Sequence, residues 1–386
     1  MPKRAIYSDK VFRGSLPFAP ATVAGGFMFV CCVGLDRAGK YAVGDVRKQT
    51  QQCLDNIRAL IEEAGLTASL VPEAAGGLGL AAADAFVLAE AAAFHAVPVA
   101  LAETMIARQL LAEAGRKAPE GELAIGPVRR GDRARLVHRD GVWRLSGTLH
   151  GVPFARRAAA LVMIADTDKG VRAVIVRRDG WQTQPSVNLA GEPRDDVTFD
   201  LALEPDSVAA PRPDVTAAAV MALGAAIRTA QMAGALRRVL ALTVAYVQER
   251  EQFGRPLSKF QAVQQAVATL AGQAAAAGAA AAIAADGVDA GLNLVAIGAA
   301  KARAGEAAGL GSAIAHQAFG AMGYARETPL NHYTRRLSAW RSEFGSETCW
   351  QEAVGRALAK AGGSPWHAIV AHELPVSRAA RAGGRP

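Results

Sequence analysis

The sequence predicts a mainly α-helical protein with a central β-domain, and three observations support this prediction. Alanine, the residue with the highest intrinsic helix propensity, is abundant and dominates residues 274–285. Apolar residues recur at helical spacing from Val220 to Val247. Between residues 122 and 208 the pattern changes to short apolar stretches, and Asp140-Gly141 separates two of them as in a β-hairpin.

Size and charge bound the function. The chain has 386 residues, 51% of them hydrophobic, which is enough to bury a large core and to form two or three domains. Its net charge of +8 suits an anionic ligand. Because the arginines are dispersed and form no block interleaved with aromatics, we expect no nucleic-acid partner and favour a polyanionic cofactor or substrate.

The cysteines and the apolar segments point to a reducing compartment. The four cysteines, at positions 31, 32, 53 and 349, form no CxxC pair and have no histidine at metal-ligand spacing. We therefore expect neither a disulfide framework nor a metal site, and a cytoplasmic location. The apolar run Gly25–Leu35 is too short to span a bilayer, so no membrane span is expected.

The first 121 residues divide into two predicted segments. In residues 1–65, the β-forming stretch Val23–Val33 predicts a buried strand. A helix is predicted to follow, with Asp45 as its N-cap and Gly65 as its C-terminal stop. Residues 66–121 predict a short helical domain with two helices, over Ala81–His95 and Val99–Gly115.

The next segments are the β-domain and the helical bundle. Residues 122–210 predict a β-domain with strands over Arg135–His138, Trp143–Leu145, Ala160–Ala165, Val171–Arg178 and Val197–Leu203. Three prolines at 205, 211 and 213 mark a linker. Residues 214–362 predict a bundle of long helices, including ones over about Phe260–Ala285 and Val295–Phe319, and residues 363–386 predict a flexible tail.

Two C-terminal motifs resemble the acyl-CoA dehydrogenase family. Residues 250–264, REQFGRPLSKFQAVQ, are similar to the family's Arg-x-Gln-Phe-Gly followed by Phe-Gln-x-Val-Gln. Residues 317–327, QAFGAMGYARE, are similar to its Gln-x-x-Gly-Gly-x-Gly-Tyr-x-Arg-Glu. Together with VPEAAGGLGL at 71–80 and WRLSGT at 143–148, the resemblance covers residues 60 to about 360. It implies a fold of N-terminal helices, a β-barrel and a C-terminal four-helix bundle.

The first 65 residues depart from that family. Their pattern, from Ser8 through Gly25-Gly26 to Asn56, resembles the first half of RidA-type enamine/imine deaminases, which implies a partial α+β segment. The catalytic arginine of that family belongs to the half that this segment does not match. We therefore expect a fusion, without deaminase activity.

The resemblance implies a reaction and a cofactor. Acyl-CoA dehydrogenases use FAD for the α,β-dehydrogenation of an acyl-CoA thioester: a carboxylate takes the α-proton and the flavin takes the β-hydride. By resemblance, Arg250 contacts the diphosphate of an FAD bound mainly by a neighbouring subunit, and Phe253 packs near its adenine. The other cofactor-binding residues that the resemblance implies are Gln252, Gln261, Gln317, Gly320 and Ser346.

The catalytic base departs from the family pattern. The family's Tyr-Glu-Gly-Thr corresponds here to Ser342–Ser346, and alignment on Gly345 puts Phe344 where the glutamate belongs. Glu343, one residue earlier, is the candidate base if a loop shift delivers it, and a structural carboxylate otherwise. Some family members carry the base on an earlier helix, where this chain has Gly224. The loop Ala124–Arg130 and the segment Gly151–Pro153 also lack the hydroxyl that usually faces the flavin.

The segment around residues 332–345 resembles the smaller subunits of two-gene acyl-CoA dehydrogenases. Two alternatives follow: an FAD-dependent acyl-CoA dehydrogenase of fatty acid metabolism, or a catalytically impaired partner subunit of a heteromeric one. In both, we expect an acyl-CoA substrate, a homo-oligomer or a heteromer with a homologous subunit, and an electron-transfer flavoprotein or similar acceptor. Arg335, Arg336 and Arg341 face either a phosphate or solvent.

Overall fold

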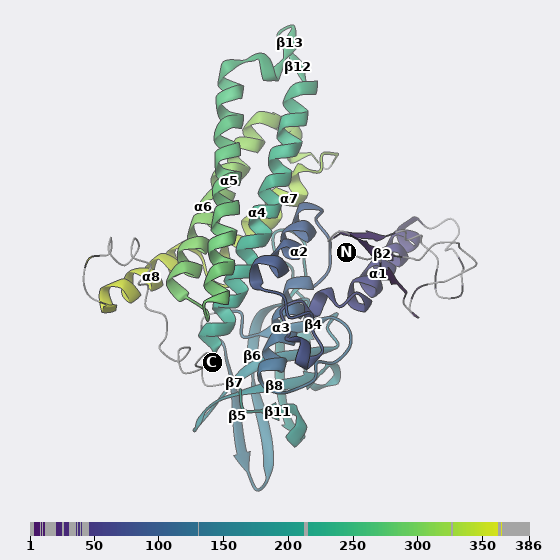
Figure 1. The fold of residues 1–386 in the computed structure, drawn as a ribbon, viewed down its shortest axis with the longest axis vertical. Coiled ribbons are helices and arrows are strands. Elements are labelled where there is room, and N and C mark those ends of the chain that lie inside the picture. Colours follow the sequence, from purple (N-terminus) through teal and green to yellow (C-terminus); the bar gives the residue numbers. More distant parts are fainter. Residues whose placement is uncertain are drawn as a thin grey trace. The chain divides into compact units, whose positions relative to one another are not determined.

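The structure is a computed structural model of the chain. It describes residues 4–7, 9, 11, 21–24, 27–30, 36, 38, 40, 46–129, 131–211, 215–325, 327–361 and 364. The chain divides into two compact units, Met1–Gly79 and Leu80–Pro386 (Figure 1). The sequence assigned residues 66–79 to the helical domain, whereas the structure groups them with the first unit, because Leu66 packs against the apolar cluster around Leu60.

The first unit holds a small antiparallel sheet and a helix. Its elements are β1 (Arg4–Ile6), β2 (Ala21–Ala24), β3 (Phe27–Val30), α1 (Val46–Glu63) and the short helices η1 (Leu66–Ala68) and η2 (Glu73–Ala75). The single strand predicted over 23–33 is wrong, because β2 and β3 pair antiparallel with Ala24 opposite Phe27. The glycine pair between them is a hairpin signal that the apolar run concealed. Gly65 has φ 76° just after α1, as a helix stop predicts, whereas Asp45 lies outside the described residues.

The second unit begins with two helices, α2 (Ala82–Phe94) and α3 (Leu101–Glu113), close to the ranges predicted. The first amide of α2 is capped from far along the chain, since the carboxylate of Asp289 accepts from Ala82 N at 2.9 Å. A β-carbon at Gly234 would overlap the backbone of Glu90, so this glycine permits the close crossing of α2 with the bundle.

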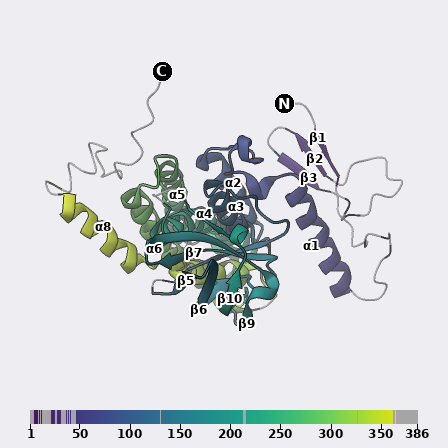
Figure 2. The same ribbon diagram turned by 90° about the horizontal axis from the view of Figure 1, so that it is seen from below.

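A curled eight-stranded sheet forms the β-domain. Its strands are β4 (Leu123–Gly126), β5 (Arg133–Arg139), β6 (Val142–Pro153), β7 (Ala160–Thr167), β8 (Gly170–Arg177), β9 (Gln182–Gln184), β10 (Arg194–Leu203) and β11 (Val208–Ala209). Their order is β11-β8-β7-β5-β6-β10-β9, with β4 beside β7, and Figure 2 shows β5, β6 and β10 next to one another. The predicted hairpin at Asp140-Gly141 is confirmed, since both residues have positive φ between β5 and β6.

Long helices form the C-terminal bundle. They are α4 (Ala217–Glu249), α5 (Gln261–Asp289), α6 (Leu294–Phe319), α7 (Leu330–Ser342) and α8 (Glu347–Ala361), with the short strands β12 (Glu251–Gln252) and β13 (Arg255–Pro256) between α4 and α5. Thr216 caps the first turn of α4, and Asn293 caps that of α6. The helices α4, α5 and α6 pack on one another along their length (Figure 1).

Two of these helices are long and apolar enough, by length and composition, to cross a membrane. In α4, 89% of the most apolar stretch is buried within the protein, as in the core helix of a bundle. In α5 only 28% of the corresponding stretch is buried. The helix α5 therefore turns much of its apolar surface outward in the single chain.

Candidate functional site

A cleft of about 920 Å³ opens where the β-domain meets the segment between α7 and α8. The β-domain contributes Arg129 from the loop after β4, the end of β6, and the loop before β10. The opposite wall contains the segment 342–346 and the start of α8, with hydroxyls of Ser346 and Thr348. The two segments that the sequence placed at the flavin, Ala124–Arg130 and Gly151–Pro153, therefore meet the segment that holds the candidate base.

The segment between α7 and α8 is a loop held by fixed donors. Phe344 has φ 52° and Gly345 has φ 97°, so the chain turns through the left-handed region twice in succession. The buried Lys301 of α6 donates from Nζ to the carbonyl oxygens of Arg341 at 2.8 Å and of Gly345 at 3.0 Å. Trp350 Nε1 donates to the carbonyl oxygen of Phe344 at 2.8 Å. These bonds satisfy the buried carbonyls and fix the loop.

The two positions that the sequence resemblance aligns with the family's catalytic base, 344 and 224, contact each other in the structure. The Phe344 ring is buried and lies against Gly224 of α4, where a β-carbon would lie 2.5 Å from Phe344 Cγ. Neither position offers a carboxylate. The glycine is required here, because a side chain at residue 224 would overlap the ring.

Glu343 lines the cleft, and two arginines hold its carboxylate. Arg194 Nε donates to Oε1 at 2.7 Å, and Arg228 Nε donates to Oε2 at 2.9 Å. Asn188 Nδ2 also donates, at 3.1 Å. Burial alone would raise the pKa of Glu343, but the charges of Arg194 and Arg228 outweigh it and lower that pKa to about 2. Glu343 lies in a loop, which was the condition for it to act as the base. Its carboxylate, however, is engaged in ion pairs with Arg194 and Arg228.

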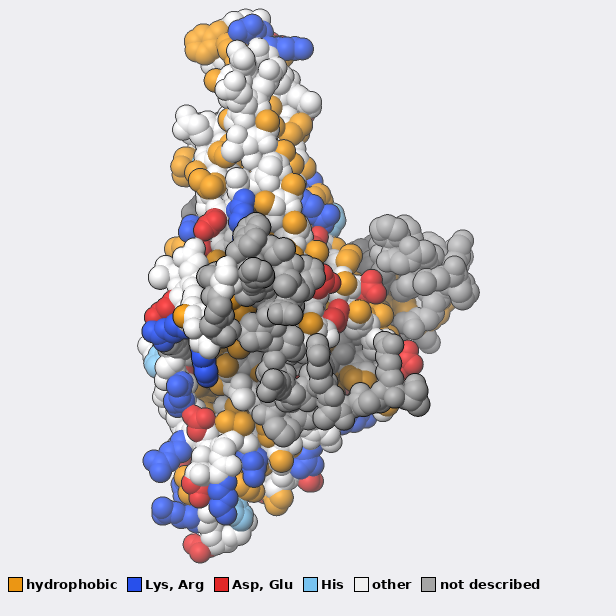
Figure 3. Space-filling view, turned by 60° about the vertical axis from the view of Figure 1, so that its left-hand side comes forward, with side chains coloured by type: hydrophobic (Ala, Val, Ile, Leu, Met, Phe, Trp, Pro, Cys, Tyr) orange, Lys and Arg blue, Asp and Glu red, His pale blue; other side chains and the backbone are white. Residues whose placement is uncertain are grey.

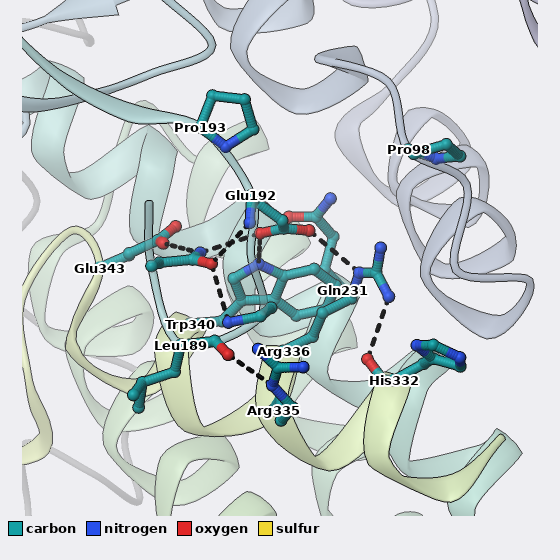
Figure 4. Close-up of polar contacts among 12 residues, drawn as sticks. Pro98, Leu189, Glu192, Pro193, Gln231, His332, Arg335, Arg336, Trp340 and Glu343 are labelled. Carbon is teal, nitrogen blue, oxygen red and sulfur yellow. Dashed lines mark hydrogen bonds and ion pairs between the residues drawn. The ribbon is translucent and has the colours of Figure 1, made fainter. Parts of the chain in front are cut away.

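Glu343 belongs to a larger network of charged side chains (Figure 4). Glu192 accepts from Arg336 Nε at 3.0 Å and from Trp340 Nε1 at 3.2 Å, and it also pairs with Arg194 at 3.0 Å. Arg228 pairs further with the buried Glu103 of α3. The network therefore joins the N-terminal helices, the β-domain and the bundle, and balanced charge makes its burial tolerable.

The remaining arginines of α7 are bound by protein groups. Arg335 Nε donates to the carbonyl oxygen of Leu189 at 2.6 Å, and Arg341 Nε donates to Glu347 at 2.6 Å. With Arg336 paired to Glu192, all three contact protein acceptors in the single chain. Solvent exposure, one of the two alternatives left open from sequence, applies to Arg335, which is exposed, and to Arg341, whose side chain is 41% exposed, whereas Arg336 is mostly buried.

The two C-terminal motifs lie at the same end of the bundle. Tyr246, one turn before Arg250, stacks on Phe319, which precedes Gly320, with ring centroids 4.0 Å apart. Arg250, Gln252, Phe253 and Gln261 are exposed around β12 and β13, and Phe253 is 91% exposed. In Figure 3 apolar and basic side chains gather at this end of the α4–α5 pair.

Gln317 and Gly320 line a second cleft, of about 680 Å³, along α6 and α7. His316 in its wall stacks on Tyr324, and the buried His316 Nδ1 has no hydrogen-bond partner among the described residues. The space beside Gly320 is open, since a β-carbon there would meet no atom within 4 Å. Leu189 lines both clefts, so they adjoin. Two adjoining clefts with polar groups in their walls can hold an extended ligand.

The predicted site residues therefore fall in three places. Ser346 and Glu343 lie in the first cleft, Gln317 and Gly320 in the second, and the Arg250 group at the bundle end. Sequence reasoning missed Asn188, Arg194 and Arg228, and it did not single out Arg129. One signal was present for Arg228: a charge inside the apolar stretch of a core helix requires a buried partner.

Known proteins resemble this architecture. Residues 215–359 match the family model described as acyl-CoA dehydrogenase, C-terminal domain. This part of the chain is therefore similar to the acyl-CoA dehydrogenase C-terminal domain. The ChsE4-ChsE5 complex from Mycobacterium tuberculosis matches with a TM-score of 0.69 at 22% identity, over 80% of this chain and 89% of that one. The second unit thus has the acyl-CoA dehydrogenase fold.

Curated relatives match each part of the chain separately. The acyl-CoA dehydrogenase IpdE2 of Mycolicibacterium smegmatis is 31% identical over 214 residues, 55% of this chain and 60% of the relative. A RutC family protein of Pyrococcus abyssi is 34% identical over 67 residues, 17% of this chain and 53% of the relative. The chain thus spans about three fifths of the first relative's length and about half of the second's. The two resemblances stated from sequence, to acyl-CoA dehydrogenases and to a RidA-type segment, are confirmed.

Proposed function

We propose that this chain is a partner subunit of an FAD-dependent acyl-CoA dehydrogenase assembly, impaired in its own proton abstraction. The contact between Phe344 and Gly224 carries this proposal, because it fills both base positions with groups that cannot accept a proton. A homologous chain would supply the carboxylate for α,β-dehydrogenation of an acyl-CoA thioester.

Glu343 does not replace the missing base in this proposal. An effective general base near neutral pH needs a pKa close to that pH. The pKa of Glu343 is lowered to about 2, so its carboxylate binds a proton weakly. Protonation would also break the ion pairs to Arg194 and Arg228, and leave each buried guanidinium group with one carboxylate partner fewer.

The clefts suit FAD. When bound, FAD supplies the acceptor for the hydride that leaves the β-carbon. The chain offers Ser346 and Thr348 hydroxyls in the first cleft, and Gln317, the open Gly320 backbone and the unpaired His316 Nδ1 in the second. Gly151–Pro153 contributes no hydroxyl, and Gly151 N already donates to Asp196 at 2.8 Å. The hydrogen bonds of the flavin would therefore come mainly from the α8 side.

The single chain leaves surfaces that another subunit would cover. Arg250 and Phe253 project from the bundle end, and α5 turns an apolar face outward. Arg250 has no ion-pair partner within the described part of the chain. A neighbouring chain that brings an FAD diphosphate to Arg250 would give that charge a partner. A chain with this fold belongs to the ChsE4-ChsE5 complex, whose name gives two components, and this supports an assembly with a second subunit.

The remaining parts of the proposal rest on the sequence analysis. An acyl-CoA substrate, a cytoplasmic location in fatty acid metabolism, and an electron-transfer flavoprotein or similar acceptor complete the proposal. No deaminase role is proposed for the first unit, which matches about half of its RutC family relative.

The test is flavin reduction by an acyl-CoA. The chain is purified alone and with a homologous subunit, flavin is measured by absorbance, and bleaching is followed without oxygen. We expect bleaching with the partner and none by the chain alone. Phe344→Glu should gain bleaching, whereas Phe344→Gln, of similar size and without a base, should not. Bleaching by the unaltered chain alone, abolished in Glu343→Gln, would contradict the proposal.

A further inference from the structure

A guanidinium group lies flat on a glycine in the wall of the first cleft. Arg129, from the loop after β4, packs over Gly151 of β6, where a β-carbon would lie 2.8 Å from Nη2 and 3.2 Å from Cζ. Gly151 has φ 63°, a conformation that also disfavours any side chain. Residue 151 must therefore be a glycine for two reasons: a side chain would overlap Arg129, and the backbone conformation disfavours one.

The loop that carries Arg129 is fastened to β6. Asp132 accepts from His150 N at 2.7 Å and contacts His150 Nδ1 at 2.9 Å. Asp132 N also donates to the carbonyl oxygen of Arg129 at 3.3 Å, which closes the turn. These bonds anchor the backbone next to Arg129 beside β6, while the Arg129 side chain itself is exposed.

Arg129 has no ion-pair partner among the described residues, although carboxylates lie around the cleft. Asp132 is engaged by His150, and Glu343 by Arg194 and Arg228. Glu352 pairs with Arg356. Asp196 accepts from Gly151 N at 2.8 Å and makes no ion pair with Arg129. Among the described residues that line this cleft, Arg129 is thus an exposed guanidinium without an ion pair, whereas Arg194 is paired.

We propose that Arg129 is an anion-recognition residue, and that the ligand of this cleft places a carboxylate or phosphate against the Arg129–Gly151 pair. The inference rests on the proposed function, because that function names the ligands. Planar guanidinium groups bind both anions through two parallel charge-assisted hydrogen bonds.

Three sources present such a group. The acyl chain carries a carboxylate if the substrate is a dicarboxylic acyl thioester. The CoA part carries phosphates, and FAD carries a diphosphate.

The experiment measures equilibrium binding to the full chain by calorimetry, after flavin content has been determined. The probes are FAD, glutaryl-CoA and pentanoyl-CoA. The two thioesters have acyl chains of equal length, and only glutaryl-CoA ends in a carboxylate. All three probes are titrated into the unaltered chain, Arg129→Met, and the control Arg139→Met, which removes an exposed arginine at the end of β5, away from this cleft.

Each outcome identifies a source or overturns the inference. In Arg129→Met we expect about a tenfold or larger loss for the anion that the arginine binds. Loss for glutaryl-CoA alone identifies the acyl carboxylate, equal loss for both thioesters identifies a CoA phosphate, and loss for FAD alone identifies the flavin diphosphate. Affinities within twofold for all three probes overturn the inference. Arg129-dependent thioester binding in a chain that binds no FAD would instead sink the cofactor part of the proposed function and leave this inference standing.

Discussion

The ring of Phe344 lies against the α-carbon of Gly224, across the boundary between a loop and the core helix α4. A β-carbon at residue 224 would lie 2.5 Å from Phe344 Cγ. Arg228, one turn further along α4, has its guanidinium 5.5 Å from the ring centroid. The aromatic ring is therefore packed on one side by backbone and on another by a charge that Glu343 neutralises.

The first prediction is that residues 224 and 344 are coupled in stability. Gly224→Ala should destabilise the chain by about 1–3 kcal/mol, because the new methyl overlaps a buried ring. Phe344→Ala should cost about 3–5 kcal/mol through the cavity it leaves. In the double variant the methyl enters that cavity, so the total loss should be smaller than the sum. Denaturant unfolding of the four proteins measures the coupling, and strict additivity would show that the residues do not touch.

The second prediction concerns the buried carboxylate of Glu343. Glu343→Gln should destabilise the chain by about 3 kcal/mol or more, since Arg194 and Arg228 lose a charged partner while staying buried. The pKa of Glu343 is lower in the folded chain, at about 2, than its ordinary value of 4.5. Its stabilisation is therefore complete above pH 4.5 and is lost as the pH falls toward 2. The difference in unfolding free energy between the two proteins should shrink over that window, and a constant difference would contradict the ion pairs.

Sequence could predict the elements whose signals are local. The hairpin at Asp140-Gly141 needs only two residues that tolerate positive φ, and α2 and α3 follow from helical spacing and the proline between them. The hairpin of β2 and β3 was missed because one apolar run hides the turn that divides it. Local signals therefore located the elements better than their pairing.

The site was harder to predict because its contacts join distant segments. The motif resemblance already matched Phe344 and Gly224 to the two base positions, but only the fold shows that these two residues are in contact. The ion pairs of Glu343 join the β-domain to α4, so no spacing in the sequence encodes them. The contact of Arg129 with Gly151 could not be predicted either, because it depends on the hairpin that brings β6 back beside the loop after β4.

The third prediction uses the buried lysine beneath the loop. Burial is the main cause that lowers the pKa of Lys301, from 10.5 to about 8. Because the unfolded chain binds the proton more tightly, stability should rise with pH between about 8 and 10.5, by up to about 3 kcal/mol. Lys301→Met lacks this group, so its unfolding free energy should not show that rise. Parallel slopes for both proteins across this window would mean that Lys301 is not buried.

The last prediction concerns Arg250 and its neighbour Arg255 at the exposed end of the bundle. Arg255 lies over the Phe260 ring, 4.1 Å from its centroid, so its charge already has a partner within the chain. Arg250 has no ion-pair partner among the described residues. In the proposed assembly, it binds the diphosphate of an FAD held by another subunit. Arg250→Met should therefore lower FAD affinity of the assembly by about tenfold or more, because a charge-assisted bond to phosphate is lost. Arg255→Met removes a charge that is also exposed, and it should change the FAD affinity little. Flavin retained per chain after gel filtration of the assembled protein measures the difference. Equal retention by the two variants would mean that the bundle end does not reach a flavin, and the role that the resemblance implies for Arg250 would be wrong.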